Sequence, residues 1–98
     1  MNFIVLPPAR DEFREAILYY KEIDRELAVR FRNKGHRVIR RVVAGPILWR
    51  ERPGGFRRVN CPVFPYYIAY IIRADLIVIV AIANGHSRPN YWRKRLKT

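Results

Sequence analysis

The stretch Tyr66-Tyr67-Ile68-Ala69-Tyr70-Ile71-Ile72, followed after a short turn by the apolar run Leu76–Ala83, decides the fold. Both runs are rich in aromatic and β-branched residues, which favour strands, and Ala74-Asp75 between them predicts a hairpin. The second run is apolar on both faces, which is typical of a strand in the middle of a covered sheet. The hairpin therefore delivers the polar, basic and aromatic segment Asn84–Arg93 to one end of the sheet, where it can contact a partner.

Two helices are predicted upstream of this hairpin. Apolar side chains recur at helical spacing over residues 9–23, and the pattern resumes after a break near Asp24. The second helix runs from about Leu27 to Ala44, where Gly45-Pro46 ends it. Gly35 inside this helix costs about 1 kcal/mol relative to alanine, so it marks either a close helix contact or a local break.

Further strands are predicted before and after the helices. Asn2–Leu6 is interpreted as a first strand that Pro7-Pro8 closes. Leu48–Arg52 and Phe56–Asn60 are interpreted as short strands around a Pro-Gly-Gly turn, and Pro89 can open a short C-terminal helix. The order predicts an α+β fold, with an N-terminal strand and a two-helix hairpin packed on a mostly antiparallel sheet and a short C-terminal helix.

The tyrosines of the aromatic run are expected to point to both sides of the sheet. Tyr66 and Tyr70 share one face of their strand and Tyr67 points to the other, because side chains alternate along a strand. Aromatic side chains on a sheet can stack on RNA bases, but in a domain of this size we expect them to form the core.

Length and composition favour one packed domain over residues 1–98. Half of the residues are hydrophobic, too many for a disordered chain. Leu76–Ala83 is far shorter than the roughly 20 residues that cross a bilayer, and Asn2–Leu6 lacks the basic lead of a signal peptide. Cys61 is the only cysteine, so no disulfide framework is expected. Because the sequence contains only two histidines in addition, no zinc site is expected either. We therefore expect a cytoplasmic protein without a cofactor.

The charge is large and unevenly distributed. Twenty Lys and Arg against eight Asp and Glu give a net charge of +12. Residues 1–26 carry four bases and six acids, a net of −2, whereas residues 27–98 carry sixteen bases and two acids, a net of +14. Such a field favours nucleic acid, the ribosome or an acidic protein as partner over a role in solubility alone. We expect partner binding on the basic outer face of the second helix, through Arg30, Arg37, Arg40 and Arg41.

The order of elements and several short motifs resemble the RelE/ParE family of type II toxin–antitoxin toxins. The resemblance covers nearly the whole chain and rests on Phe13–Tyr20, Leu27–Phe31, Gly55–Val59, Tyr66–Tyr70 and Ala81–Trp92. It implies a small α+β toxin that inhibits growth, of the kind that stabilises plasmids. It also implies an antitoxin, encoded beside the toxin, that neutralises it.

The resemblance implies one of two targets. RelE-type members cleave messenger RNA in the ribosomal decoding site, whereas ParE-type members poison DNA gyrase. RelE-like catalysis uses Lys and Arg from the central strands and a tyrosine or similar group in the tail. Here Arg57 and Arg58 lie where the strand lysines are expected, but Tyr67 stands where an arginine should be. That departure favours the ParE-like target, with RelE-like cleavage, a non-toxic binding module and a basic nucleic-acid-binding domain as alternatives.

Candidate catalytic residues follow only from the RelE-like alternative. Cleavage through the 2′-OH of RNA needs a base, an acid and cations that hold the phosphate. His86 could act as the general base or the general acid, and Tyr91 could stack on a nucleobase of the RNA. The phosphate could be held by Arg57, Arg58 and Arg88.

The same residues also have a non-catalytic interpretation. His86 and Arg88 could be solvated or contact a partner, while Arg57 and Arg58 could bind an antitoxin. We expect His86, Arg88 and Tyr91 to form a functional surface at the end of the sheet, which Trp92 anchors by packing.

Overall fold

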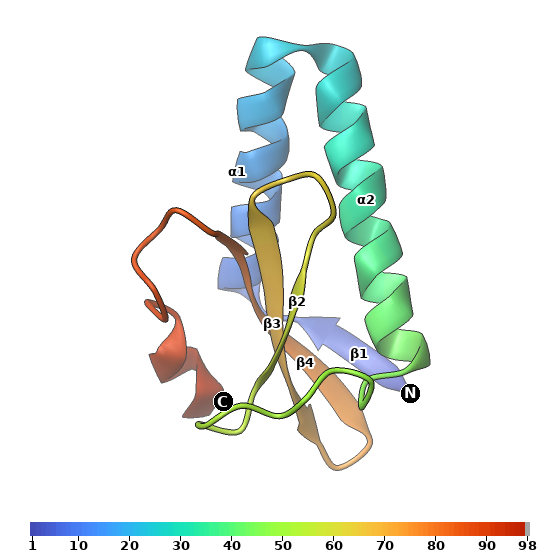
Figure 1. Ribbon diagram of the computed structural model, residues 1–98, viewed down its shortest axis with the longest axis vertical. Helices are drawn as coiled ribbons and strands as arrows, with labels where there is room; N and C mark the ends of the chain where they lie inside the picture. Colours follow the sequence, from blue (N-terminus) through green and yellow to red (C-terminus); the bar gives the residue numbers. More distant parts are fainter. Residues whose placement is uncertain (98) are drawn as a thin grey trace.

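The computed structural model describes residues 1–97, and its elements confirm the expected α+β architecture (Figure 1). They are β1 (Asn2–Val5), α1 (Pro7–Ile23), α2 (Arg25–Ala44), β2 (Arg57–Asn60), β3 (Tyr66–Arg73), β4 (Leu76–Asn84) and the 3₁₀ helix η1 (Arg93–Lys97). The two long helices lie side by side, and the turn between them projects past the end of the sheet.

The sheet has the strand order β1-β4-β3-β2. β1 pairs with β4 in parallel, whereas the β3–β4 and β2–β3 pairs are antiparallel. The prediction that Leu76–Ala83 forms an inner strand is confirmed, because β4 has a neighbour on each side. β1 pairs only with residues 76–79, so the outer edge of β4 beyond Ile79 has no strand beside it among the described residues.

Residues at the helix ends and at the contact between α1 and α2 explain the helical hairpin. α1 begins at Pro7, two residues before the expected start, because proline has no N–H to satisfy and its φ suits the first helical turn. The predicted break at Asp24 is confirmed, since its carboxylate accepts from the Glu26 N–H at 3.2 Å and caps α2. A Cβ at Gly35 would lie 2.6 Å from Phe13 Cε1, so Gly35 marks a close helix contact and not a break.

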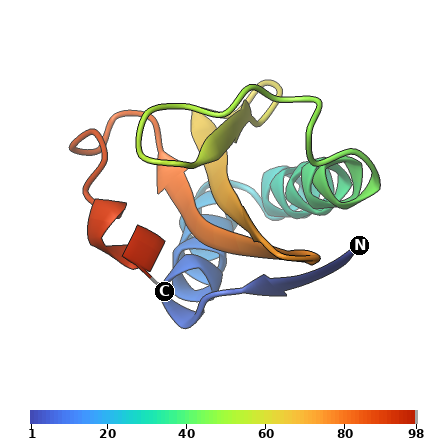
Figure 2. The ribbon, with the colours of Figure 1, turned by 90° about the horizontal axis from the view of Figure 1, so that it is seen from below.

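The core lies on both sides of the sheet. α2 and the C-terminal segment cover opposite faces of the sheet (Figure 2). Tyr70 packs with Val38 and Val42 on the helix side, and Tyr67 packs with Trp92 on the tail side. The expected core role of these tyrosines is confirmed. A register shift between Ala69 and Tyr70 leaves Val80 of β4 without an opposite partner in β3.

The expected strand Leu48–Arg52 is wrong. The segment between α2 and β2 forms turns and bends, with one isolated bridge between Arg52 and Phe56. Backbone carbonyls of this segment accept hydrogen bonds from side chains and not from a neighbouring strand. Tyr70 donates to the Pro46 carbonyl and Arg57 donates to the Trp49 carbonyl.

The expected start of the C-terminal helix at Pro89 is also wrong. Asn90 has φ 59°, a left-handed conformation that cannot continue a right-handed helix. The 3₁₀ helix therefore begins only at Arg93. In the described part of the chain, no helix is long and apolar enough to span a membrane.

Candidate functional site

The segment that follows β4 begins with a tight, polar turn. The side-chain oxygen of Asn84 accepts from the His86 backbone N–H at 2.8 Å, and the Asn84 backbone carbonyl accepts from the Ser87 N–H at 3.0 Å. This turn exposes His86 and Arg88 to solvent. Both residues therefore lie where the sequence predicts a contact surface.

Trp92 anchors the far end of this segment on the sheet. Its side chain is fully buried, and its indole N–H donates to the Tyr67 hydroxyl at 2.8 Å. Phe56 packs edge-to-face against the indole ring, with ring centroids 4.9 Å apart. The structure thus supports an anchoring role for Trp92, since it buries both the ring and its polar N–H with a partner.

Glu12 of α1 joins the helix, the sheet and the C-terminal segment. Its carboxylate accepts from the Tyr91 hydroxyl, from the Ile82 backbone N–H at 3.1 Å and from the Arg95 guanidinium at 3.1 and 3.2 Å. Arg95 also donates to the Val80 carbonyl at 3.0 Å. These two side chains, 17% and 20% exposed, thereby pair backbone groups on the edge of β4 that β1 leaves uncovered.

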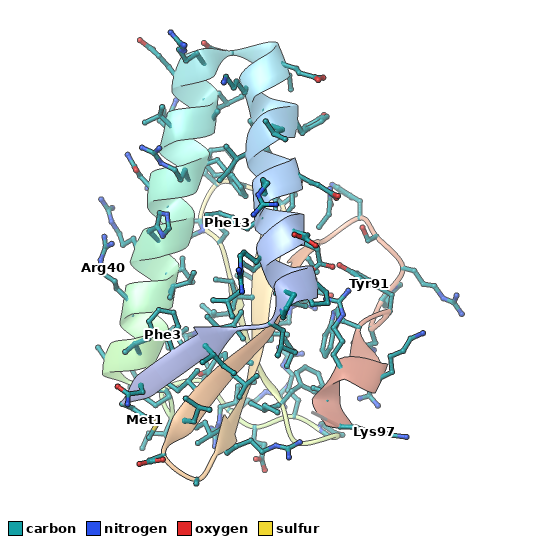
Figure 3. All side chains as sticks on the ribbon, turned by 180° about the vertical axis from the view of Figure 1, so that it is seen from behind. Met1, Phe3, Phe13, Arg40, Tyr91 and Lys97 are labelled. Atoms are coloured by element: carbon teal, nitrogen blue, oxygen red, sulfur yellow. The ribbon has the colours of Figure 1, made fainter. Side chains whose placement is uncertain are left out.

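This arrangement constrains the chemistry of Tyr91. Burial raises the pKa of the phenol, and the hydrogen bond and negative charge of Glu12 raise it further. The hydroxyl is therefore neutral at physiological pH and committed to Glu12 as a donor. Figure 3 shows Tyr91 close to α1, apart from the exposed basic side chains of α2.

Arg57 and Arg58 do not form a common site. Arg57 donates to the Trp49 carbonyl at 2.6 Å, in the loop between α2 and β2. Arg58 lies on the opposite face, with its guanidinium carbon 3.7 Å from the centroid of the Tyr67 ring. Alternation along β2 separates the two side chains, so only Arg58 shares a face with Trp92.

The residues described here do not assemble the base and acid that RNA cleavage needs. The His86 ring makes no hydrogen bond or ion pair within residues 1–97. Tyr91 is held by Glu12, while Arg57 is tied to the α2–β2 loop. The five candidate catalytic residues are thus distributed over the exposed tail turn and two sheet faces.

The basic face of α2 is exposed as expected. Its side chains are solvent-exposed at the four predicted partner-binding positions, Arg30, Arg37, Arg40 and Arg41. Figure 3 shows Arg40 pointing away from the body of the protein. Over the described residues none of these arginines forms a salt bridge, although Arg41 lies over the Trp49 ring, 5.6 Å from its centroid.

Cys61 has no feature of a reactive or ligating thiol. Its side chain is buried, and this burial raises the pKa of the thiol, although Lys34 partly opposes the rise. The part of the chain that the structure describes contains no group of three or more His, Cys, Asp or Glu side chains that could hold a metal ion.

Sequence reasoning missed Glu12 and Arg95. Neither residue has a role predicted from the sequence patterns. A signal was present, because Glu12 falls between Ala9 and Ala16 on the buried face of α1. A carboxylate on such a face needs a buried partner.

A family model matches most of the chain. The model of the ParE toxin of the type II toxin–antitoxin system parDE matches residues 3–89. The chain belongs to the ParE toxin family. Its RelE/ParE-like fold and its place among the toxins of type II systems are therefore established, and the resemblance seen in the sequence is confirmed. No curated protein matches the chain. In this ParE-family chain, Tyr91, Trp92 and Arg95 lie beyond the matched range.

Proposed function

We propose that this toxin inhibits growth by acting on DNA gyrase in the cytoplasm and that a cognate antitoxin neutralises it. The observation that carries the proposal is the dispersal of the candidate RNA-cleaving residues. His86 lies in an exposed turn, where its ring makes no hydrogen bond or ion pair to another described residue, and the hydroxyl of Tyr91 is engaged by Glu12. A ParE-family chain whose described candidates are not assembled as a general base and acid is better suited to bind a protein target than to cleave RNA.

The antitoxin is expected to bind the basic face of α2. A row of exposed arginines that form no salt bridge with the other residues of 1–97 attracts an acidic segment, and an initially disordered segment can fold along such a surface. Arg30, Arg37, Arg40 and Arg41 are the proposed contacts. Charge reversal at Arg37 and Arg40 should weaken antitoxin binding in isothermal titration calorimetry while leaving the fold intact by circular dichroism.

The target is tested with two purified reactions run in parallel. Supercoiling by gyrase should fall and cleaved DNA should accumulate as the toxin is added, while a ribosome-containing translation reaction should proceed with intact messenger RNA. The matched control is the toxin premixed with its antitoxin, which should inhibit neither. Cleaved messenger RNA with unaffected gyrase would instead support the RelE-like alternative, and inactivity in both reactions would support the non-toxic binding module.

A further inference from the structure

Two large aliphatic side chains stand exposed in the loop that follows α2. Ile47 is 74% exposed and Leu48 is 75% exposed. Figure 1 shows this segment leaving α2 and crossing the end of the molecule opposite the α1–α2 turn. Single exposed aliphatic residues are common on protein surfaces. Two consecutive aliphatic residues that are this exposed form an apolar surface that is not buried in the core of this chain.

The backbone on each side of this pair is fixed to the sheet. The hydroxyl of the fully buried Tyr70 donates to the Pro46 carbonyl at 2.6 Å. Arg57 donates to the Trp49 carbonyl, also at 2.6 Å. The carbonyls that flank Ile47 and Leu48 are therefore both pinned by side chains of the sheet, so the loop presents the pair in a defined position.

Contacts within the loop add to this rigidity. The Leu48 N–H donates to the Gly45 carbonyl at 3.1 Å. Leu48 also packs closely on Gly45, since a Cβ built there would lie 2.8 Å from Leu48 Cδ1. Because the loop is ordered before binding, docking its apolar side chains costs less conformational entropy than docking a flexible loop.

The surroundings of the pair are basic. The last turns of α2 carry Arg40 and Arg41, and the chain after Trp49 carries Arg50 and Arg52. Glu51 is the only acid between Arg40 and Phe56. A partner that covers Ile47 and Leu48 must therefore offer apolar area surrounded by negative charge.

We propose that Ile47 and Leu48 form a preformed apolar knob that enters an apolar pocket with an acidic rim on the folded target protein. The inference deepens the proposed function and rests on it for the identity of the target. A rigid knob suits a pocket that exists before binding. An antitoxin segment that folds on binding supplies side chains to grooves and has no pocket of its own.

The test uses the full chain with Ile47→Ser and Leu48→Ser combined. The matched control combines Ile23→Ser and Val63→Ser, which removes two aliphatic side chains that are 60% and 81% exposed elsewhere on the surface. The knob variant should need at least tenfold more protein for half-inhibition of gyrase supercoiling and should lose growth arrest. Its melting temperature and its antitoxin affinity should match those of the parent and of the control.

A second arm tests the acidic rim. Arg50→Ala should slow association with gyrase and weaken its dependence on salt, because a rim charge acts mainly on encounter. Arg25→Ala, at the far end of α2, removes the same charge without this effect. An unchanged association rate for Arg50→Ala would overturn the proposal that the pocket on the target has an acidic rim.

The remaining outcomes separate this inference from the proposed function. If the parent inhibits gyrase and the knob variant inhibits it within twofold, the knob is overturned and the gyrase function stands. If the parent spares gyrase but arrests growth, the gyrase function fails, and loss of arrest in the knob variant alone still supports the knob. Reduced antitoxin affinity, or a parent dimer that the variant converts to a monomer, would assign the loop to another occupant and overturn the proposal. A parent that affects neither gyrase nor growth overturns it as well.

Discussion

The carboxylate of Glu12 accepts a hydrogen bond from the hydroxyl of Tyr91, a residue 79 positions later in the chain. The same carboxylate binds the Ile82 N–H and Arg95, so one side chain of α1 holds both the edge of β4 and the C-terminal segment. This connection makes the position of the C-terminal segment depend on the N-terminal helix.

Glu12→Gln should destabilise the fold. The amide keeps the size of the side chain but loses the charge that faces Arg95, and it cannot accept from all three of its present donors. Leaving a buried donor unsatisfied costs about 1–3 kcal/mol. The free energy of unfolding in urea measures this loss. The exposed Glu15→Gln is the control and should change it by less than about 0.5 kcal/mol; equal values for the two variants would show that the Glu12 contacts contribute nothing.

Trp92→Ala should lower thermal stability and toxic activity together. The substitution empties a fully buried site and leaves the Tyr67 hydroxyl without the indole donor. Truncation of a buried aromatic residue costs about 3–5 kcal/mol. Thermal unfolding and growth arrest should therefore both change, whereas Trp92→Phe should retain more of each. A melting temperature equal to that of the parent would exclude the anchoring role.

Tyr91 should make the fold sensitive to alkaline pH. Its pKa is higher in the folded protein than the ordinary value of 10.0, so the unfolded chain loses this proton first. The contribution is complete below about pH 10 and is lost as pH rises from there towards the folded pKa. Urea unfolding between pH 8 and 11 should show stability falling less steeply in Tyr91→Phe than in the parent. The slope need not vanish, because burial also raises the pKa of Tyr20, Tyr66 and Tyr70. Identical slopes would contradict the assignment to Tyr91.

His86 and Arg88 should separate activity from stability. Both side chains are exposed, so His86→Ala and Arg88→Ala should each change the free energy of unfolding by less than about 0.5 kcal/mol. We expect Arg88→Ala to reduce growth arrest in a stably folded protein, because the tail turn exposes this charge to solvent, where the proposed target can contact it. If both variants arrest growth as the parent does, the turn is structural and the site assignment is wrong.

The sequence predicts those parts of the fold that local patterns determine. The β3–β4 hairpin follows from its apolar and aromatic runs, and the helix break follows from the capping side chain of Asp24. The loop after α2 could not be predicted in this way, because donors from Arg57 and the distant Tyr70 fix its backbone. The left-handed Asn90 likewise delays the last helix without a local signal that outweighs Pro89.

The candidate site was predictable only in part. His86 and Arg88 lie in the turn after β4 and Trp92 packs on the sheet as expected, since all three follow directly from the place of the hairpin. The partner of Tyr91 lies at the other end of the chain, and no spacing rule connects them. Arg57 and Arg58 are adjacent in the sequence, but alternation along β2 places their side chains on opposite faces of the sheet.

The parallel pairing of β1 with β4 affects how the chain reaches this structure during synthesis. Phe3 lies opposite Ile77, and the register closes only between residues 2–5 and 76–79. Contacts so distant in sequence form late and slow folding, because the intervening chain must be ordered first. At roughly 5–20 residues per second, a ribosome needs seconds to add the residues that separate β1 from β4, and β1 stays unpaired with β4 during that time. The nascent toxin therefore cannot complete its sheet until β4 has emerged, which delays any activity that needs the whole sheet until then.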